Sequence, residues 1–391
     1  MSNVKHLPKG VWAVAAVIGL SLAALGPLLI LVPLLFPGDL DPLVVMIASV
    51  GWILLVLGIS LVWAAVGGWQ GREAQPFYSK WAWGLFAGLS LVFGVVGLLL
   101  PDAAHTSVAF APIHFALITF PALLLLSLLA LVVGREQAMA LRRAVVTVAG
   151  GASSVLLAVP VEIVGLLISG GIGAAFTLLL PSGQMEMERL VALLMRWAER
   201  PPTDESAVLS LVASPFILIT LALTLGVVTP VIEELGKTLV MGLMGIWVRP
   251  SRLTAFLWGA ACGLGFAWFE GVSNGALGLG ESVGWASSVG VRLFATAMHM
   301  LASGILGLGW YEFWAQRWWL LLVSYVVAVV IHGLWNLNVI FSLAGIGLSE
   351  TSPSLGRVVT VSGGVIQGGL ILFALVALYA IPWAVRRRER V

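Results

Sequence analysis

Long apolar stretches separated by short polar loops dominate the pattern of the chain. A stretch of at least 18 apolar residues can cross a hydrocarbon core of about 30 Å as an α-helix. The pattern predicts an all-α, polytopic transmembrane helical bundle of about 10–12 spans. The expected spans are residues 10–36, 43–66, 81–100, 114–133, 207–228, 231–248, 253–275, 291–311, 319–342 and 358–384, with a further apolar run at 144–180.

The run 144–180 does not fit a single span. It is too long for one crossing and barely long enough for two. Pro160 and the Ser169, Gly170, Gly171 break predict a bent or re-entrant element.

Between residues 181 and 206 the pattern becomes amphipathic. An apolar stripe lies opposite charged side chains, which predicts a helix lying at the membrane interface. The stripe consists of Met187, Leu190, Leu194 and Trp197, and Pro201, Pro202 and Asp204 end it. We therefore expect three regions: an N-terminal membrane region at 1–180, an interfacial helix and linker at 181–206, and a C-terminal helical core at 207–391.

Composition narrows the class of protein. Of 391 residues 60% are hydrophobic and 10% are charged, and the mean hydropathy is +1.07. These values exclude a soluble globular protein and predict membrane lipid as the surrounding partner. The net charge of +2 arises from Lys and Arg in short loops and at the ends, so we expect no nucleic-acid partner. The single cysteine, Cys262, excludes an internal disulfide.

Basic loop residues predict the orientation of the chain. Arg386, Arg387, Arg388 and Arg390 place the C-terminus in the cytoplasm. Each half of the chain is self-consistent under this rule, but the two halves agree only if the 144–180 run returns to its own side or crosses twice. The count for the C-terminal core places the polar level described below toward the outer face.

Ionisable residues inside the expected spans are few. A charge in the hydrocarbon core costs from about 2.5 kcal/mol upward, so such residues face a protein interior or a water-filled cavity and are candidates for function. They are Glu233, Glu234 and Lys237 in one span, Glu270, His299 and His332 in the three that follow, and His114 and Glu162 in the N-terminal half.

Helical spacing relates the first three of these residues. Glu233 and Lys237 are four residues apart and share a face, so the lysine can offset one carboxylate. Glu234 lies about 100° away around the helix. Two adjacent carboxylates in a low dielectric repel each other, which is typical of groups that take up and release a proton.

Depth in the membrane relates the remaining candidates. Consecutive spans run antiparallel, so Glu233, near the start of its span, and Glu270, near the end of the next, lie toward the same membrane face. His299 lies about two turns into the third span. His332 and Asn336 precede the end of the fourth and share one face. The four spans therefore place these residues at one level.

These residues, in this order, resemble the PrsW family of intramembrane proteases, which belongs to the wider group of CAAX prenyl proteases and bacteriocin-processing enzymes. The resemblance covers roughly residues 207–342. The four motifs are Glu233-Glu234-x-x-Lys237, Phe266-x-x-x-Glu270, His299 and His332-x-x-x-Asn336. CAAX enzymes carry a histidine at the position of Glu270, so the glutamate favours PrsW and argues against a prenylated substrate. The resemblance implies a CAAX-protease-like helical core and a multi-pass protein of the bacterial cell membrane.

The implied activity is an endopeptidase that cleaves membrane-anchored protein substrates near or within the bilayer. Peptide hydrolysis requires an activated water and a stabilised oxyanion. In a metal mechanism, His299 and His332 with Glu270 or Glu234 would bind Zn²⁺, and Glu233 would act as general base. In a metal-free mechanism, Glu233 would activate water with help from Glu270, and His332 and Asn336 would donate to the oxyanion.

The same charges leave an alternative open. Glu233, Glu234, Glu270 and the histidines are also compatible with a proton or cation path through a transporter or channel. Such proteins usually contain repeated halves with interrupted helices, and no internal repeat is visible in this sequence. The residues do not predict the oligomeric state.

Overall fold

The computed structural model describes residues 7–35, 42–72, 75–199, 214–349 and 352–389. Within these ranges the chain is helical, and Pro76 and Ala140 form an isolated β-bridge. Ten of the described helices are long and apolar enough to cross a membrane, which confirms the all-α, polytopic prediction.

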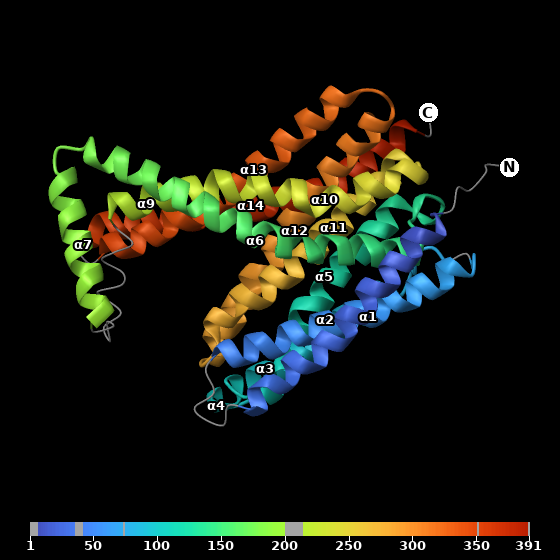
Figure 1. Ribbon diagram of the computed structural model, residues 1–391, viewed down its shortest axis with the longest axis horizontal. Coiled ribbons are helices and arrows are strands. Elements are labelled where there is room, and N and C mark those ends of the chain that lie inside the picture. Colours follow the sequence, from blue (N-terminus) through green and yellow to red (C-terminus); the bar gives the residue numbers. More distant parts are fainter. Residues whose placement is uncertain (1–6, 36–41, 73–74, 200–213, 350–351, 390–391) are drawn as a thin grey trace. The chain divides into compact units, whose positions relative to one another are not determined.

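The helices follow one another along the chain as coloured in Figure 1. The candidate spans are α1 (Lys9–Leu31), α2 (Pro42–Trp69), α3 (Ala82–Leu99), α5 (Ala111–Val133), α6 (Leu141–Leu178), α9 (Pro215–Leu223) with α10 (Thr229–Trp247), α11 (Arg252–Gly275), α12 (Ser282–Trp314), α13 (Trp318–Ser349) and α14 (Pro353–Arg388). Two shorter helices, α4 (Asp102–His105) and α7 (Gly183–Glu199), lie between them.

The chain divides into two compact units. The first unit is formed by Met1–Val155, Leu235–Ala328 and Ala374–Val391, and the second by Leu156–Glu234 and Val329–Phe373. The boundaries fall inside α6, α10, α13 and α14. The division into 1–180, 181–206 and 207–391 that the sequence suggests stays a prediction.

Helix α11 forms the core of the first unit. All of its residues from Ala255 to Phe269 are buried. Two glycines allow α12 to approach closely: a Cβ atom at Gly259 would lie 2.0 Å from the carbonyl oxygen of Ser303, and one at Gly263 would lie 2.3 Å from that of His299. Small residues at a helix contact are the usual means of close packing in membranes. The sequence of α11 therefore fixes the position of the backbone that carries His299.

The 144–180 run is one helix, α6, with Pro160 inside it. Its 38 residues extend over about 57 Å at a rise of 1.5 Å per residue. The re-entrant alternative is therefore wrong for this segment. Pro160 removes one backbone hydrogen bond from this helix, and the rest of the helix stays intact. Transmembrane helices tolerate proline and glycine in this way.

The expected spans 207–228 and 231–248 are not two helices. From Pro215 to Trp247 the structure has one continuous helical element, and residues 207–213 lie outside the described residues. A π-helical turn at Thr224–Val228 joins α9 to α10. Pro230 predicts a break, since proline clashes with the carbonyl four residues earlier. The wider π-turn, placed just before Pro230, lets the helix continue through this position.

The amphipathic prediction for 181–206 is confirmed as a helix, α7. Gly183 and Leu190 are its buried residues, whereas Leu194 is 53% exposed. Its location at a membrane interface stays a prediction. Pro201, Pro202 and Asp204, expected to end it, lie outside the described residues.

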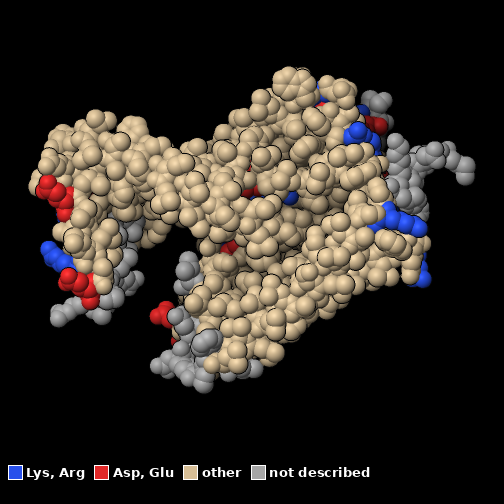
Figure 2. Space-filling model, viewed as in Figure 1, with Lys and Arg blue, Asp and Glu red and all other residues tan. Residues whose placement is uncertain are grey.

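Basic residues of the first unit gather at one of its ends. Arg252, at the start of α11, pairs with Glu312 near the end of α12 at 2.9 Å. Arg386, near the end of α14, donates to the carbonyl oxygen of Val132 at the end of α5 at 2.7 Å. Figure 2 shows Lys and Arg gathered at the right-hand end of the view. The residues at these helix ends include Lys9, Arg72, Lys80, Arg135, Arg142, Arg249, Arg252, Arg317 and Arg386.

This arrangement resolves the conflict between the two halves of the chain. With α6 as one crossing and Pro215–Trp247 as another, the basic helix ends of both halves face the same side. By the positive-inside rule we expect these helix ends to face the cytoplasm.

Single cysteines test this orientation. Glu281, before α12, and Lys80, before α3, are both exposed and lie at opposite ends of the first unit. We expect Glu281→Cys to react with a membrane-impermeant thiol reagent in intact cells, and Lys80→Cys to react only after permeabilisation. Cys262 is buried and provides the unreactive background. Labelling of Lys80→Cys in intact cells would reverse the orientation.

Candidate active site

Helix α10 carries three charged residues of the predicted site. Glu233 is 6% exposed, and Glu234 and Lys237 are fully buried. Glu234 is the last residue of the second unit in this helix, and Leu235 is the first residue of the first unit. The carboxylates therefore belong to one side-chain cluster and the lysine to another, and each cluster can be described within its own unit.

In the second unit, His332 of α13 lies between the two glutamates. Its Nδ1 is 2.9 Å from Oε1 of Glu234, and its Nε2 is 3.8 Å from Oε2 of Glu233. A carboxylate can only accept, so Nδ1 carries the proton that is donated to Glu234. In the neutral ring Nε2 is then unprotonated, and it lies on the side of Glu233. The two carboxylates thus differ in position: one accepts the proton at Nδ1 and the other lies beside Nε2.

Asn336, one turn after His332 on α13, binds the backbone of the helical element Pro215–Trp247. Its Nδ2 donates to the carbonyl oxygen of Leu225 at 2.8 Å, inside the π-turn that joins α9 to α10. The structure therefore brings Glu233, Glu234, His332 and Asn336 together in the second unit, as the sequence predicts.

In the first unit, His299 of α12 is bonded through both ring nitrogens. Its Nε2 lies 2.6 Å from Oε2 of Glu270 on α11, and its Nδ1 lies 3.0 Å from Nζ of Lys237. An ammonium group can only donate, so Nδ1 accepts and Nε2 carries the proton given to Glu270. The unprotonated nitrogen is therefore Nδ1 in His299, whereas it is Nε2 in His332.

Phe266 covers the contact between Lys237 and His299. The ammonium nitrogen lies 4.0 Å from the centre of the Phe266 ring, and the Phe266 and His299 rings are 5.5 Å apart. A cation over an aromatic face is attracted by the ring quadrupole, most strongly where water is excluded. The motif Phe266-x-x-x-Glu270 thus places both of its residues at His299, one turn of α11 apart.

Two further residues hold Glu270 in place. Arg292 of α12 pairs with Oε2 of Glu270 at 2.7 Å, and Asn274 donates to Oε1 at 3.1 Å. Sequence reasoning missed both residues. Asn274 lies four positions after Glu270, and Arg292 is a charge at the start of an expected span, so each carried a signal that pointed to this contact.

The donor atoms at His332 fit a metal ion. A histidine nitrogen and a carboxylate oxygen lie 3.8 Å apart. Two ligands of one tetrahedral zinc are roughly 3.3 Å apart, since Zn–N and Zn–O bonds measure about 2.0–2.2 Å. Glu234 at Nδ1 matches the carboxylate that usually supports a metal-binding histidine through its other nitrogen. Glu270 at His299 Nε2 repeats this pattern, although Lys237 donates to the remaining nitrogen of that ring.

Two other buried histidines are structural. The Nε1–H of Trp285 donates to Nδ1 of His114 at 2.9 Å, and the His114 Nε2 lies 3.0 Å from the carbonyl oxygen of Val272. His105 packs edge-on against Phe110, with ring centres 4.3 Å apart. His114, which the sequence gives as an ionisable residue inside an expected span, is buried within the protein with both ring nitrogens bonded.

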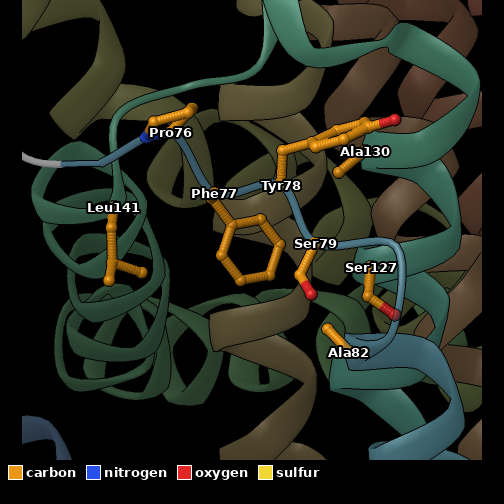
Figure 3. Close-up of a pocket in the computed structure, with 8 residues that line it drawn as sticks. All are labelled: Pro76, Phe77, Tyr78, Ser79, Ala82, Ser127, Ala130 and Leu141. Carbon is orange, nitrogen blue, oxygen red and sulfur yellow. The ribbon is translucent and has the colours of Figure 1, made fainter.

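Two cavities of the first unit lie away from the predicted residues. One, of about 240 Å³, is lined by Pro76, Phe77, Tyr78, Ser79, Ala82, Ser127, Ala130 and Leu141 (Figure 3). Another, of about 620 Å³, is an apolar groove lined by α1, α2, α6 and α10, with Val14, Val146 and Val240 among its residues. Neither contains a carboxylate or histidine, so neither offers the groups that hydrolysis requires.

Lys237 should be essential for stability. Lys237→Met removes the ammonium donor of His299 Nδ1 while keeping a side chain of similar length. Removing one partner of a buried charged contact typically costs about 3–5 kcal/mol. We expect a clearly lower melting temperature for the purified protein in detergent, whereas Lys80→Met, at an exposed position, should melt like the wild type. Equal melting of Lys237→Met and wild type would contradict a role in charge balance.

Comparison with known proteins agrees with this geometry. The family model described as PrsW family intramembrane metalloprotease matches residues 163–365, more than half of the chain, and includes every residue of both clusters. Among curated proteins and solved structures, none matches the chain. The ten apolar helices among the described residues, together with the family match, make it an integral, multi-pass membrane protein. The chain belongs to the PrsW family of intramembrane metalloproteases.

Proposed function

We propose that the protein is an endopeptidase that hydrolyses peptide bonds of membrane-anchored proteins, near or within the bilayer of the bacterial cell membrane. The observation that carries this proposal is the arrangement at His332, where Glu234 orients the ring and Glu233 lies at its unprotonated nitrogen. Such an arrangement provides a proton acceptor beside a site for an activated water.

Glu233 is proposed to handle the proton of the attacking water. A water held at His332 Nε2 would lie within reach of Glu233 Oε2, which is 3.8 Å from that nitrogen. The carboxylate would take the proton as the water attacks the carbonyl carbon. It would then return the proton to the leaving amine nitrogen, which completes hydrolysis without net consumption of protons.

His332 is proposed as a nitrogen ligand of a zinc ion, through its Nε2, beside the carboxylate of Glu233. The expectation that His299 is a further ligand stays a prediction. A bound zinc would acidify the water and polarise the substrate carbonyl. Glu233 lies beside His332 and would act as oxygen ligand or as proton acceptor. Glu270, expected from the sequence as a ligand, is proposed instead to orient His299, since its Oε2 lies 2.6 Å from Nε2 of that ring.

Lys237 sets a condition on any metal binding at His299. Its ammonium donates to His299 Nδ1, and an ammonium and a divalent cation cannot share one nitrogen lone pair. We propose that Lys237 leaves this nitrogen when an ion binds and otherwise supplies the positive charge of the cluster. In a metal-free mechanism Lys237 would stay in place, and Glu233 would activate the water alone.

Site variants should separate catalysis from folding. Glu233→Gln and His332→Ala are each expected to reduce cleavage by at least about 10²-fold, the usual contribution of a general acid–base group. The assay uses a panel of single-span membrane proteins reconstituted in liposomes. Asn338→Ala serves as matched control, because Asn338 lies on the same helix but binds Gly363 and Gln367 of α14. Unchanged cleavage by both site variants would contradict the protease mechanism.

Metal content should distinguish the two mechanisms. We expect one zinc per chain in purified wild type by elemental analysis, and its loss in His332→Ala. Glu234→Gln should weaken zinc affinity by about 10–100-fold, as found for carboxylates that support metal-binding histidines. Glu233→Gln decides the role of that residue: loss of zinc makes it a ligand, and retained zinc with lost activity makes it the proton acceptor. Fully active enzyme without zinc would establish the metal-free mechanism.

The transporter or channel alternative lacks a comparable observation. The family match covers both clusters, and the charged residues form short, directed contacts around two histidines. Such contacts favour a site that holds one reacting group.

A further inference from the structure

The π-turn between α9 and α10 changes which backbone groups are bonded. The N–H of Thr229 bonds to the carbonyl oxygen of Thr224, five residues earlier. In an α-helix the same N–H would bond to Leu225. Pro230 has no N–H, so it cannot supply the α-helical bond to Gly226. The carbonyl groups of Leu225 and Gly226 therefore lack their usual α-helical donors.

Helix α13 lies directly over these two carbonyl groups. Asn336 Nδ2 donates to Leu225 at 2.8 Å. At Gly333 a Cβ atom would lie only 2.4 Å from the carbonyl oxygen of Gly226, so glycine is required for this approach. On the other side of the contact, a Cβ atom at Gly226 would lie 2.5 Å from the side chain of Leu337.

The contact between α13 and the π-turn lies about one helical turn from His332 on α13 and from Glu233 on α10. Gly333 follows His332 directly, and Asn336 is one helical turn further on. On the other helix, Glu233 comes five residues after the end of the π-turn. Each residue of an α-helix turns the chain by about 100°, so the extra residue of the π-turn decides which face of α10 meets α13.

We propose that Asn336 is a positioning residue that locks the π-turn against α13 and thereby holds Glu233 and Glu234 at His332. The sequence suggested Asn336 as a donor to the oxyanion. In the structure its amide instead satisfies a backbone carbonyl released by the π-turn, a task that an apolar side chain cannot perform. This inference rests on the proposed function of Glu233 and His332.

Two variants disturb the lock in different ways. Asn336→Ala removes the donor to Leu225. Gly333→Ala keeps Asn336 and all acidic and histidine residues but pushes the π-turn away from α13. If the lock positions the site, both variants should lower kcat by about 10–100-fold, since a displacement near 1 Å can cost that much. Both should also shift the pH at which activity is half-maximal, because the contacts of His332 with the two glutamates change.

The matched control is again Asn338→Ala, which removes an interhelical amide contact of the same type two residues along α13. It should leave the pH profile of cleavage unchanged. If Asn336 instead donates to the oxyanion, Asn336→Ala should be less active at every pH, with an unshifted pH profile. Gly333→Ala, which keeps Asn336, should then remain active. That pair of results would overturn the positioning role.

Hydrogen exchange provides a readout that does not need activity. We expect Asn336→Ala and Gly333→Ala to exchange the backbone amides of Val231–Lys237 at least about 10-fold faster than wild type, and Asn338→Ala to leave them unchanged. Unchanged exchange in the first two variants would overturn the inference even if the protein cleaves its substrates. If these two variants exchange faster than the wild type but the wild type cleaves no substrate, the proposed function is rejected and the positioning role of Asn336 is supported.

Discussion

Ionisable side chains buried among apolar helices must be paired, because a lone charge in such surroundings costs several kcal/mol. The structure meets this constraint with two histidine–carboxylate pairs. His332 is bonded to Glu234, and His299 to Glu270. In each pair the carboxylate takes one ring nitrogen and fixes the proton there. The requirement for pairing thus also determines which nitrogen of each histidine carries the proton.

Pairing at these distances requires helices that approach closely and keep one rotation about their axes. In the first unit Gly259 and Gly263 bring α11 against the backbone of α12, so that Glu270 meets His299. In the second unit Gly333 and the π-turn perform the same task for α13 and the start of α10. Small residues and an altered helical turn therefore act together to set the geometry of the polar groups.

Helix α10 links the two arrangements through its own sequence. Glu233 and Glu234 contribute to the cluster at His332, and Lys237, one turn later, contributes to the cluster at His299. A single helix thus carries a carboxylate pair and a compensating ammonium within five residues. This stretch lies within the region that matches the PrsW family, and in this chain it connects charge, helix position and proposed chemistry.

Periodicity alone was sufficient for the membrane class, because a bilayer requires apolar helices of a minimum length and tolerates few charges within them. For the same reason the residues of the site stood out in the sequence: Glu233, Glu234, Lys237, Glu270, His299 and His332 are conspicuous in apolar runs. The predicted range of about 10–12 spans includes the ten found among the described residues. The sequence did not predict that the run 144–180 forms a single helix, or that the expected spans 207–228 and 231–248 belong to one helical element.

What the tertiary structure decided is the partner of each polar atom. Sequence spacing could not show that Asn336 binds the carbonyl group of Leu225, or that Arg292 of α12 pairs with Glu270 of α11. It also could not show which nitrogen of each histidine is protonated. These outcomes depend on the rotation and separation of neighbouring helices, which are set by contacts such as those of Gly263 and Gly333. The sequence therefore determined which residues must avoid lipid, and only the packing of the helices decided what each of them binds.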